Sequence, residues 1–158
     1  MTVVAAIVTR DGSWMGADSL AADADIGAIT ASPKVGKFGN LLIGFSGNWK
    51  AGQTMFDMAS KAHLPTMKQL LDNFQTDVKE WNFLFVEAGK IYEVDEDLAI
   101  LEMPSEKGIS FGAIGSGAQP ALGALYVSHE DEGSLMRALE ASAEFSATVR
   151  GPFRIVGL

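Results

Sequence analysis

Short apolar segments separated by turn signals open the chain, a pattern typical of β-strands. Residues 2–9 are rich in β-branched side chains and stop at Arg10-Asp11-Gly12, which predicts a turn. Residues 13–18 continue the pattern at once, so we expect these two segments to form a hairpin. A polar loop rich in Ala and Asp is predicted from there to Pro33.

A second hairpin is predicted directly after this loop, and the hydrophobic period then changes. Residues 34–38 and 41–46 are the expected strands, with Gly39-Asn40 at their turn. The apolar positions follow helical spacing across residues 48–63, where they fall at Met55, Met58, Ala59 and Ala62. We therefore expect the chain to pass from strand to helix at Gly47.

A second helix is predicted to begin at Leu64-Pro65, since proline ends one helix and is tolerated in the first turn of the next. An amphipathic stripe marks one face of this helix at Leu70, Leu71, Phe74, Val78 and Trp81. The remaining expected elements are strands at 83–86, 91–94, 98–102 and 109–114, helices at about 118–128 and 134–149, and a last strand at 153–156.

This order of elements predicts the fold class. Strands grouped in blocks, rather than alternating with helices, favour antiparallel sheets and an α+β fold. Each pair of helices is amphipathic on one side, so each pair is expected to cover one sheet. Two antiparallel sheets flanked by helices give a four-layer αββα sandwich. No linker, repeat or low-complexity tract divides residues 1–158, which we expect to form a single domain.

The composition argues against several classes of function. The net charge of −8 disfavours nucleic-acid binding, which needs clusters of Lys and Arg. The absence of cysteine excludes disulfides, thiolate metal ligands and a cysteine nucleophile. No apolar run approaches the ~20 residues of a membrane-spanning helix, and the first residues lack the basic segment of a signal peptide. We expect a cytoplasmic protein with no membrane association, no metal and no other cofactor.

Several residues outside the N-terminal region are weaker site candidates. His63 and His129 are far apart in the sequence and lack the spacing of metal ligands. The acidic run 130–132 is typical of a solvated loop. Phe45 and Trp49 flank the strand-to-helix turn, where they either pack in the core or shape a specificity pocket.

The N-terminus offers a candidate nucleophile. Met1 precedes Thr2, and a small second residue generally permits removal of the initiator methionine. Thr2 would then have both its hydroxyl and a free α-amine. A threonine hydroxyl needs an adjacent base, and an α-amine with a pKa of about 8 can act as one. We expect no propeptide, so that removal of Met1 alone would expose Thr2.

Four motifs follow Thr2 in order. Gly16-Ala17-Asp18-Ser19 ends the second strand with a carboxylate, and Ser32-Pro33-Lys34-Val35 opens the third with an ammonium group. Residues 42–47 end the fourth strand at Gly47, and Ala113-Ile114-Gly115-Ser116-Gly117 precedes a helix. In this order the chain resembles proteasome β-subunits and their bacterial relatives, which are N-terminal-nucleophile (Ntn) hydrolases, and in particular a short bacterial or phage-type branch. Gly47 is displaced from the family's spacing by one residue.

The resemblance implies a role for each matching residue. Thr2 would attack the scissile carbonyl, and its amine would accept the proton. Lys34 would lower neighbouring pKa values through its charge, and Asp18 would hold Lys34 charged and oriented. Gly47 would donate its backbone N–H to the oxyanion, and Ser116 would form a hydrogen bond near the amine.

Each of these residues also has a structural interpretation when it is considered alone. Asp18 fits a turn at a strand end, and Lys34 fits an ordinary surface position after a proline. Gly47 fits a tight turn from strand to helix. Ser116 fits the N-cap of a helix.

The resemblance fails at the turn before the last strand. Ala147-Thr148-Val149-Arg150 still matches the family, but the next positions do not. The family places an Asp and then a Ser in this turn, where they support the threonine amine, whereas this chain has Arg150-Gly151-Pro152-Phe153. Gly151 stands at the position of the Asp. Loss of this carboxylate would remove part of what positions the base.

Two hypotheses follow. The first is a threonine peptidase or amidohydrolase that acts on polypeptides in a homo-oligomeric, proteasome-like ring, with an ATP-dependent unfoldase as a candidate partner. The second is a catalytically degenerate Ntn-fold protein with a structural or assembly role, borne by a phage or prophage particle. We favour the first, because an inactive scaffold has no chemical reason to retain Thr2, Asp18 and Lys34 together.

Overall fold

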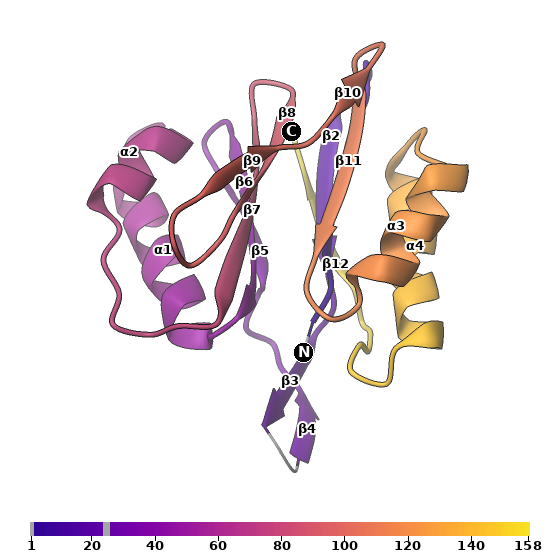
Figure 1. Ribbon diagram of the computed structural model, residues 1–158, viewed down its shortest axis with the longest axis horizontal. Coiled ribbons are helices and arrows are strands. Elements are labelled where there is room, and N and C mark those ends of the chain that lie inside the picture. Colours follow the sequence, from indigo (N-terminus) through magenta and orange to yellow (C-terminus); the bar gives the residue numbers. More distant parts are fainter. Residues whose placement is uncertain (1, 24–25) are drawn as a thin grey trace.

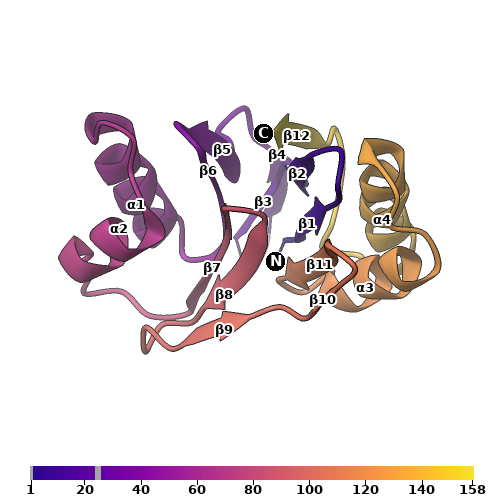
Figure 2. The ribbon, with the colours of Figure 1, turned by 90° about the horizontal axis from the view of Figure 1, so that it is seen from above.

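The computed structural model describes residues 2–23 and 26–158 of the chain. Its elements stack in four layers, with two sheets face to face between two helix pairs (Figure 1). Seen from above in Figure 2, α1 and α2 cover one side of the sheets, and α3 and α4 cover the other. The expected four-layer αββα sandwich is confirmed.

The first sheet has the N-terminal strand at its centre. In the described part of the chain it is a five-stranded antiparallel sheet ordered β10 (Ser105–Glu106), β11 (Ile109–Ile114), β1 (Val4–Val8), β2 (Ser13–Ala17) and β12 (Arg154–Gly157). Val4 lies opposite Ile114 on one side and Ala17 on the other. The beginning of β1 is therefore enclosed by the end of β11 and the end of β2.

The second sheet is also antiparallel. Its order is β5 (Val35–Phe38), β6 (Leu41–Gly47), β7 (Trp81–Glu87), β8 (Lys90–Val94) and β9 (Ile100–Glu102). Val35 lies opposite Gly44. The beginning of β5, directly after Lys34, is thus next to the end of β6, directly before α1.

Three apolar clusters hold the layers together. α1 (Trp49–Lys61) and α2 (Met67–Asn73) pack on the outer face of the second sheet, and α3 (Ala118–Val127) and α4 (Glu132–Phe145) pack on the outer face of the first. The inter-sheet cluster contains Val4, Ala6, Met15, Val35, Leu42, Leu84, Val86, Ile91 and Ile114. Because this cluster fixes one sheet against the other, the strand ends that bear the candidate residues meet at one end of the sandwich.

The region between β2 and β5 differs from the expected loop. β3 (Leu20–Asp23) and β4 (Ile26–Ile29) form a hairpin that projects from the sandwich in Figure 1, with Leu20 opposite Ile29. The prediction of a loop to Pro33 was wrong because Ala, Asp and Gly, which dominate this segment, are depleted in strands generally. Residues 24 and 25 lie outside the described part of the chain.

The second helix is shorter than its apolar stripe suggested. α2 begins at Met67 and ends at Asn73, and Trp81 already belongs to β7. The helical spacing misled the prediction, because Phe74, Val78 and Trp81 do pack in one cluster, but from a segment that is not helical.

The last helix shows a similar effect. α4 ends at Phe145 rather than at Val149, although Val149 remains fully buried against the first sheet. The sequence also gave no signal for β10, a two-residue strand whose residues are exposed. Within residues 2–23 and 26–158, no helix combines the length and the hydrophobicity needed to cross a bilayer.

Gly44 is expected to be an intolerant position between the two sheets. A Cβ there would lie 2.4 Å from Val4 Cγ1 and 2.9 Å from Met15 Sδ. Gly44→Ala should therefore lower the free energy of unfolding by about 1–3 kcal/mol, as overpacking does in other cores. Gly123→Ala on the exposed side of α3 is the control, because no atom lies within 4 Å of its added Cβ, and alanine favours a helix by up to ~1 kcal/mol. Equal urea-unfolding curves for the two variants would contradict this account.

Candidate active site

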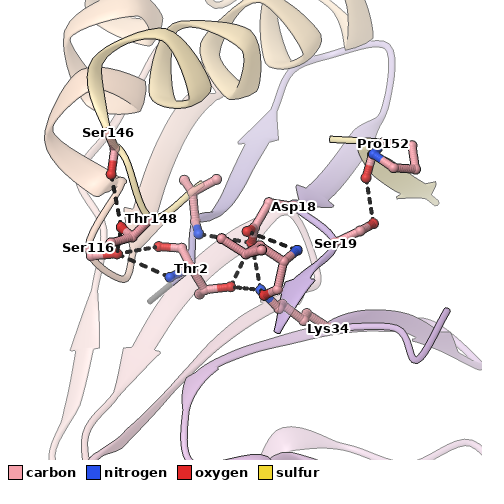
Figure 3. A network of polar contacts seen from close by, with 10 residues as sticks. Thr2, Asp18, Ser19, Lys34, Ser116, Ser146, Thr148 and Pro152 are labelled. Atoms are coloured by element: carbon pink, nitrogen blue, oxygen red, sulfur yellow. Dashed lines mark hydrogen bonds and ion pairs between the residues drawn. The ribbon is translucent and has the colours of Figure 1, made fainter. Parts of the chain in front are cut away.

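Three buried polar side chains meet at the beginning of β1. The Thr2 hydroxyl donates to Asp18 Oδ1 over 2.6 Å and accepts a hydrogen bond from Lys34 Nζ (Figure 3). Lys34 Nζ also lies 2.8 Å from Asp18 Oδ1. All three residues are less than 5% exposed. The structure therefore brings together three of the residues that the sequence singled out, and it places the Thr2 oxygen between a carboxylate and an ammonium group.

The Asp18 carboxylate is held by the backbone as well. Oδ1 accepts from the Val3 N–H at 3.2 Å, and Oδ2 accepts from the Leu20 N–H at 3.3 Å. Val3 directly follows Thr2 in the chain, so this contact fixes the carboxylate relative to Thr2. Asp18 is thus more than a turn residue, since its two oxygens join β1 to the start of β3.

Lys34 is held in a partly desolvated position. Its ammonium group donates to the Leu20 carbonyl over 2.5 Å as well as to Asp18 and Thr2. Burial lowers the pKa of Lys34 below its ordinary value, and the hydrogen bond and charge of Asp18 partly oppose this shift. The ring of Trp49 lies 5.8 Å from Nζ, within the range of a cation–π contact. These contacts rule out the interpretation of Lys34 as an ordinary surface lysine.

A chain of hydroxyl groups leads away from the other side of Thr2. The Thr2 backbone N–H donates to Ser116 Oγ over 3.1 Å, and Ser116 Oγ lies 2.8 Å from Thr148 Oγ1. Thr148 Oγ1 lies in turn 2.9 Å from Ser146 Oγ (Figure 3). The structure places Ser116 beside the Thr2 nitrogen as the resemblance implied. The N-cap of α3 is Gly117 and has no side-chain cap hydrogen bond, so the N-cap interpretation of Ser116 fails.

Two glycines surround the same end of the sandwich. Gly47 ends β6 with φ +86°, and a Cβ there would lie 1.9 Å from the Glu80 carbonyl oxygen. Gly115 follows β11 with φ +93°, and its added Cβ would lie 2.4 Å from the Thr2 carbonyl oxygen. Both positions thus require glycine for conformation and for space. Gly47 and Gly115 line one cavity of about 650 Å³, so Gly47 shares an open space with a direct neighbour of Thr2.

The turn that lacks the family's Asp is held by backbone contacts. Ser19 N donates to the Arg150 carbonyl over 3.0 Å, and Ser19 Oγ donates to the Pro152 carbonyl over 2.5 Å (Figure 3). A Cβ on Gly151 would meet nothing closer than Phe153 at 3.5 Å. A side chain at position 151 would therefore meet no steric obstacle. The side chain that contacts Ser116 Oγ carries a neutral hydroxyl rather than a carboxylate.

Sequence reasoning missed part of this site. The sequence predicts Trp49 in the core or at a pocket, whereas its ring contacts the Lys34 ammonium. Phe45 is a core residue, 1% exposed, and packs edge-on against Trp49 with 5.2 Å between the ring centroids. The sequence assigns no role to Ser146 or Thr148, although both belong to the hydroxyl chain. The family match at residues 147–150 is the only sequence signal near these hydroxyl groups. Their contacts depend on the path of the chain after α4, and such a path has no local sequence signal.

The four layers, with the first strand beginning at the shared end of both sheets, define the proteasome-like Ntn fold. Among solved structures, BPH from Thiobacillus denitrificans in complex with epoxomicin aligns with a TM-score of 0.78, over 98% of this chain and 97% of that one, at 21% identity. Eukaryotic HslV from Trypanosoma brucei aligns with a TM-score of 0.77, over 99% and 98%, at 16% identity. The Anbu complex of Pseudomonas aeruginosa, solved as a helical assembly, gives 0.73 over 99% and 80%, at 13% identity.

No protein-family model and no curated protein matches the sequence. At identities of 21% and below, the likeness to these structures establishes the fold and leaves the chemistry to the residues of this chain. The resemblance seen in the sequence is confirmed at the level of the fold.

The Lys34–Asp18 pair is expected to be strongly coupled. Lys34→Met leaves the buried Asp18 carboxylate without its cation and should lower the free energy of unfolding by about 3 kcal/mol, as does breaking other buried ion pairs. Asp18→Asn should have a similar effect. In the double variant no charge is left unpaired, so its loss should be smaller than the sum of the two single losses. Additive losses in chemical denaturation would show that the pair is not coupled.

Proposed function

We propose that this protein is an N-terminal threonine hydrolase of the peptidase type, with Thr2 as its nucleophile. The main support is the position of the Thr2 hydroxyl between Asp18 and Lys34 on a proteasome-like Ntn fold. A buried ion pair is costly to desolvate, and apolar residues of similar volume often replace such a pair without loss of stability. The Asp18–Lys34 ion pair contacts one hydroxyl before the first strand. A role in activating that hydroxyl explains the pair better than a contribution to stability does.

The proposed reaction begins once Thr2 has a free α-amine. Thr2 Oγ attacks the carbonyl carbon of an amide, and its proton passes to the α-amine, directly or through a water. The Lys34 charge favours the developing alkoxide, while Asp18 keeps Lys34 protonated and oriented. Negative charge on the substrate oxygen is stabilised by the Gly47 N–H. Collapse of the tetrahedral intermediate breaks the C–N bond, and the protonated α-amine gives its proton to the leaving amine.

The product of this first stage is an acyl-enzyme ester on Thr2. Water then attacks the ester with the same amine as base, which releases the carboxylic acid and restores the hydroxyl. Ser116 is proposed to orient the amine through the contact that it makes with the Thr2 nitrogen, with Thr148 and Ser146 fixing Ser116. Apart from water, these steps use only groups of the chain and the substrate.

The proposed setting is an assembly that acts on polypeptides. The Anbu complex with the same fold has been solved as a helical assembly, which supports homo-oligomerisation of this chain. A ring with an unfoldase partner in the cytoplasm is the extension of this proposal that the resemblance to the proteasome family suggests.

A degenerate Ntn-fold protein with a structural role is the second candidate. The observation in its favour is the turn Arg150-Gly151-Pro152-Phe153, which lacks the family's carboxylate. Such a protein would have no use for the threonine hydroxyl, so the two candidates differ in whether Thr2 reacts.

Reaction of Thr2 with a peptide epoxyketone tests the proposal directly. This probe needs the hydroxyl and the free amine of one N-terminal threonine, and the T. denitrificans BPH with this fold was solved with epoxomicin. Intact mass spectrometry should show one adduct of the full probe mass on a chain that begins at Thr2. Thr2→Ala should form none, and Thr2→Ser should retain some reaction because it keeps both groups. A chain that begins at Thr2 and forms no adduct would favour the structural candidate.

Thr148→Val should slow both adduct formation and peptide turnover by about tenfold, the rate equivalent of about one hydrogen bond. Valine keeps the shape of threonine but cannot fix Ser116, so the unfolding midpoint should change little while the pH dependence of the rate shifts. Thr148→Ser restores the hydroxyl and should restore the rate. Equal rates for the Val and Ser variants would remove Thr148 from the mechanism.

A further inference from the structure

The cavity shared by Gly47 and Gly115 is strongly acidic. Its lining in the described part of the chain consists of Ser46, Gly47, Glu80, Trp81, Asn82, Asp95, Glu96, Asp97 and Gly115. Four of these nine residues are carboxylates, and none is a lysine or arginine. At about 650 Å³, the cavity has room for a long side chain. Its charge exceeds what the overall acidic composition of the chain explains.

This cavity adjoins the proposed reaction centre. Gly47, the proposed oxyanion donor, forms part of its wall. Gly115 forms another part and packs directly against the Thr2 carbonyl group. A substrate whose carbonyl oxygen reaches Gly47 therefore has a neighbouring side chain at the mouth of the acidic cavity.

Two of the four carboxylates, those of Asp95 and Glu96, are held by backbone N–H groups. Asp95 Oδ1 accepts from the N–H groups of Asp97 and Ala99, both at 3.0 Å. Glu96 accepts from the N–H of Glu80, and this contact joins the β8–β9 turn to the start of β7. Because the backbone holds these two groups in position, they lose little side-chain freedom when a cation binds beside them.

A hydroxyl group also lines this space. Ser46 is only 7% exposed, and its hydroxyl forms no hydrogen bond with any described residue. No fully buried side-chain oxygen among the described residues lacks a partner, so this hydroxyl is reached from the open space. In the strand register Ser46 lies opposite Asn82, whose amide donates to Glu93 Oε1 over 3.2 Å. Burial, and to a smaller extent the charge of Asp95, raises the pKa of the Glu93 carboxyl, while the hydrogen bond from Asn82 lowers it. An unpartnered acceptor beside an excess of carboxylates fits a ligand with N–H donors.

From these observations we propose that the acidic cavity is a substrate subsite that selects a lysine or arginine side chain next to the scissile bond. This specificity rests on the proposed hydrolase function. A bare metal ion is a poorer occupant, because the described residues contain no group of three or more acidic or histidine side chains arranged to hold one. A guanidinium or ammonium group on a flexible stem can instead satisfy carboxylates that are spread around a wall.

Paired peptides that differ only in charge test this inference. Internally quenched peptides have arginine at one position, from the third residue before the scissile bond to the third after it, and their partners have citrulline, the neutral isostere. At one position arginine should raise kcat/KM over citrulline by roughly tenfold, a factor expected for a partly desolvated charge pair. The advantage should shrink as salt is added.

The variant Asp95→Asn/Glu96→Gln/Asp97→Asn keeps the oxygen acceptors of the β8–β9 turn and removes three charges. It should bring the arginine-to-citrulline ratio to within about twofold of one. Glu130→Gln/Glu140→Gln/Glu144→Gln is the matched control, because it removes three charges from in and beside the outer helix α4 and should retain the preference of the unmodified protein.

The epoxyketone adduct separates the two ways in which the test can fail. An adduct on Thr2 with a ratio near one at every position overturns the acidic subsite and leaves the proposed function standing. A preference that survives in the Asp95→Asn/Glu96→Gln/Asp97→Asn variant also overturns the subsite. No adduct and no cleavage of any peptide overturns the hydrolase proposal, and the subsite with it.

Discussion

The arrangement at the start of β1 depends on one buried ion pair that joins the two sheets. Asp18 follows β2 of the first sheet, and Lys34 precedes β5 of the second. Because neither charge can be left without the other in this desolvated position, the pair fixes how the sheets meet at this end. The Thr2 hydroxyl contacts both partners, so its position follows from the same constraint. The geometry around the candidate nucleophile is thus a property of the sandwich rather than of a flexible terminus.

The apolar packing between the sheets keeps the two members of this ion pair close together. Val4 and Met15 of the first sheet come so close to Gly44 of the second that no Cβ fits between them. Gly44 lies opposite Val35, the residue directly after Lys34. The close approach of the sheets therefore brings the Lys34 ammonium within reach of Asp18. The small residue in the core thus allows the ion pair to form at the edge of the core.

Much of this organisation was predictable from the sequence, because it depends on local patterns. The β-branched segment before Arg10 and the helical spacing after Gly47 placed β1 and α1 correctly, and the order of elements gave the four layers. The predictions failed where the local hydrophobic pattern of a segment does not match the secondary structure that it adopts in the folded protein. Trp81 continued a helical stripe but lies in a strand, since burial against a common cluster imposes the same apolar spacing on a non-helical segment.

The site shows the same division. Thr2, Asp18 and Lys34 were found through their motifs at strand ends, and the structure brings them into contact. The contact of Trp49 with the Lys34 ammonium and the acidic wall formed by the β8–β9 turn have no such signature. Both depend on which residues two separate segments bring together, and this becomes visible only once the sheets are packed.

The neutral hydroxyl chain beside the Thr2 nitrogen bears on whether this site can react without the family's carboxylate. A carboxylate within about 4–6 Å of an amine favours its protonated form and raises its pKa. Ser116, Thr148 and Ser146 can orient the nitrogen through hydrogen bonds without adding negative charge. A free amine at this position, with the Lys34 charge on the far side of the hydroxyl and no added carboxylate, would have less stabilisation of its protonated form. In the proposed reaction, glycine at position 151 would therefore weaken the orientation of the base but favour its unprotonated form, and these two effects on the rate would oppose each other.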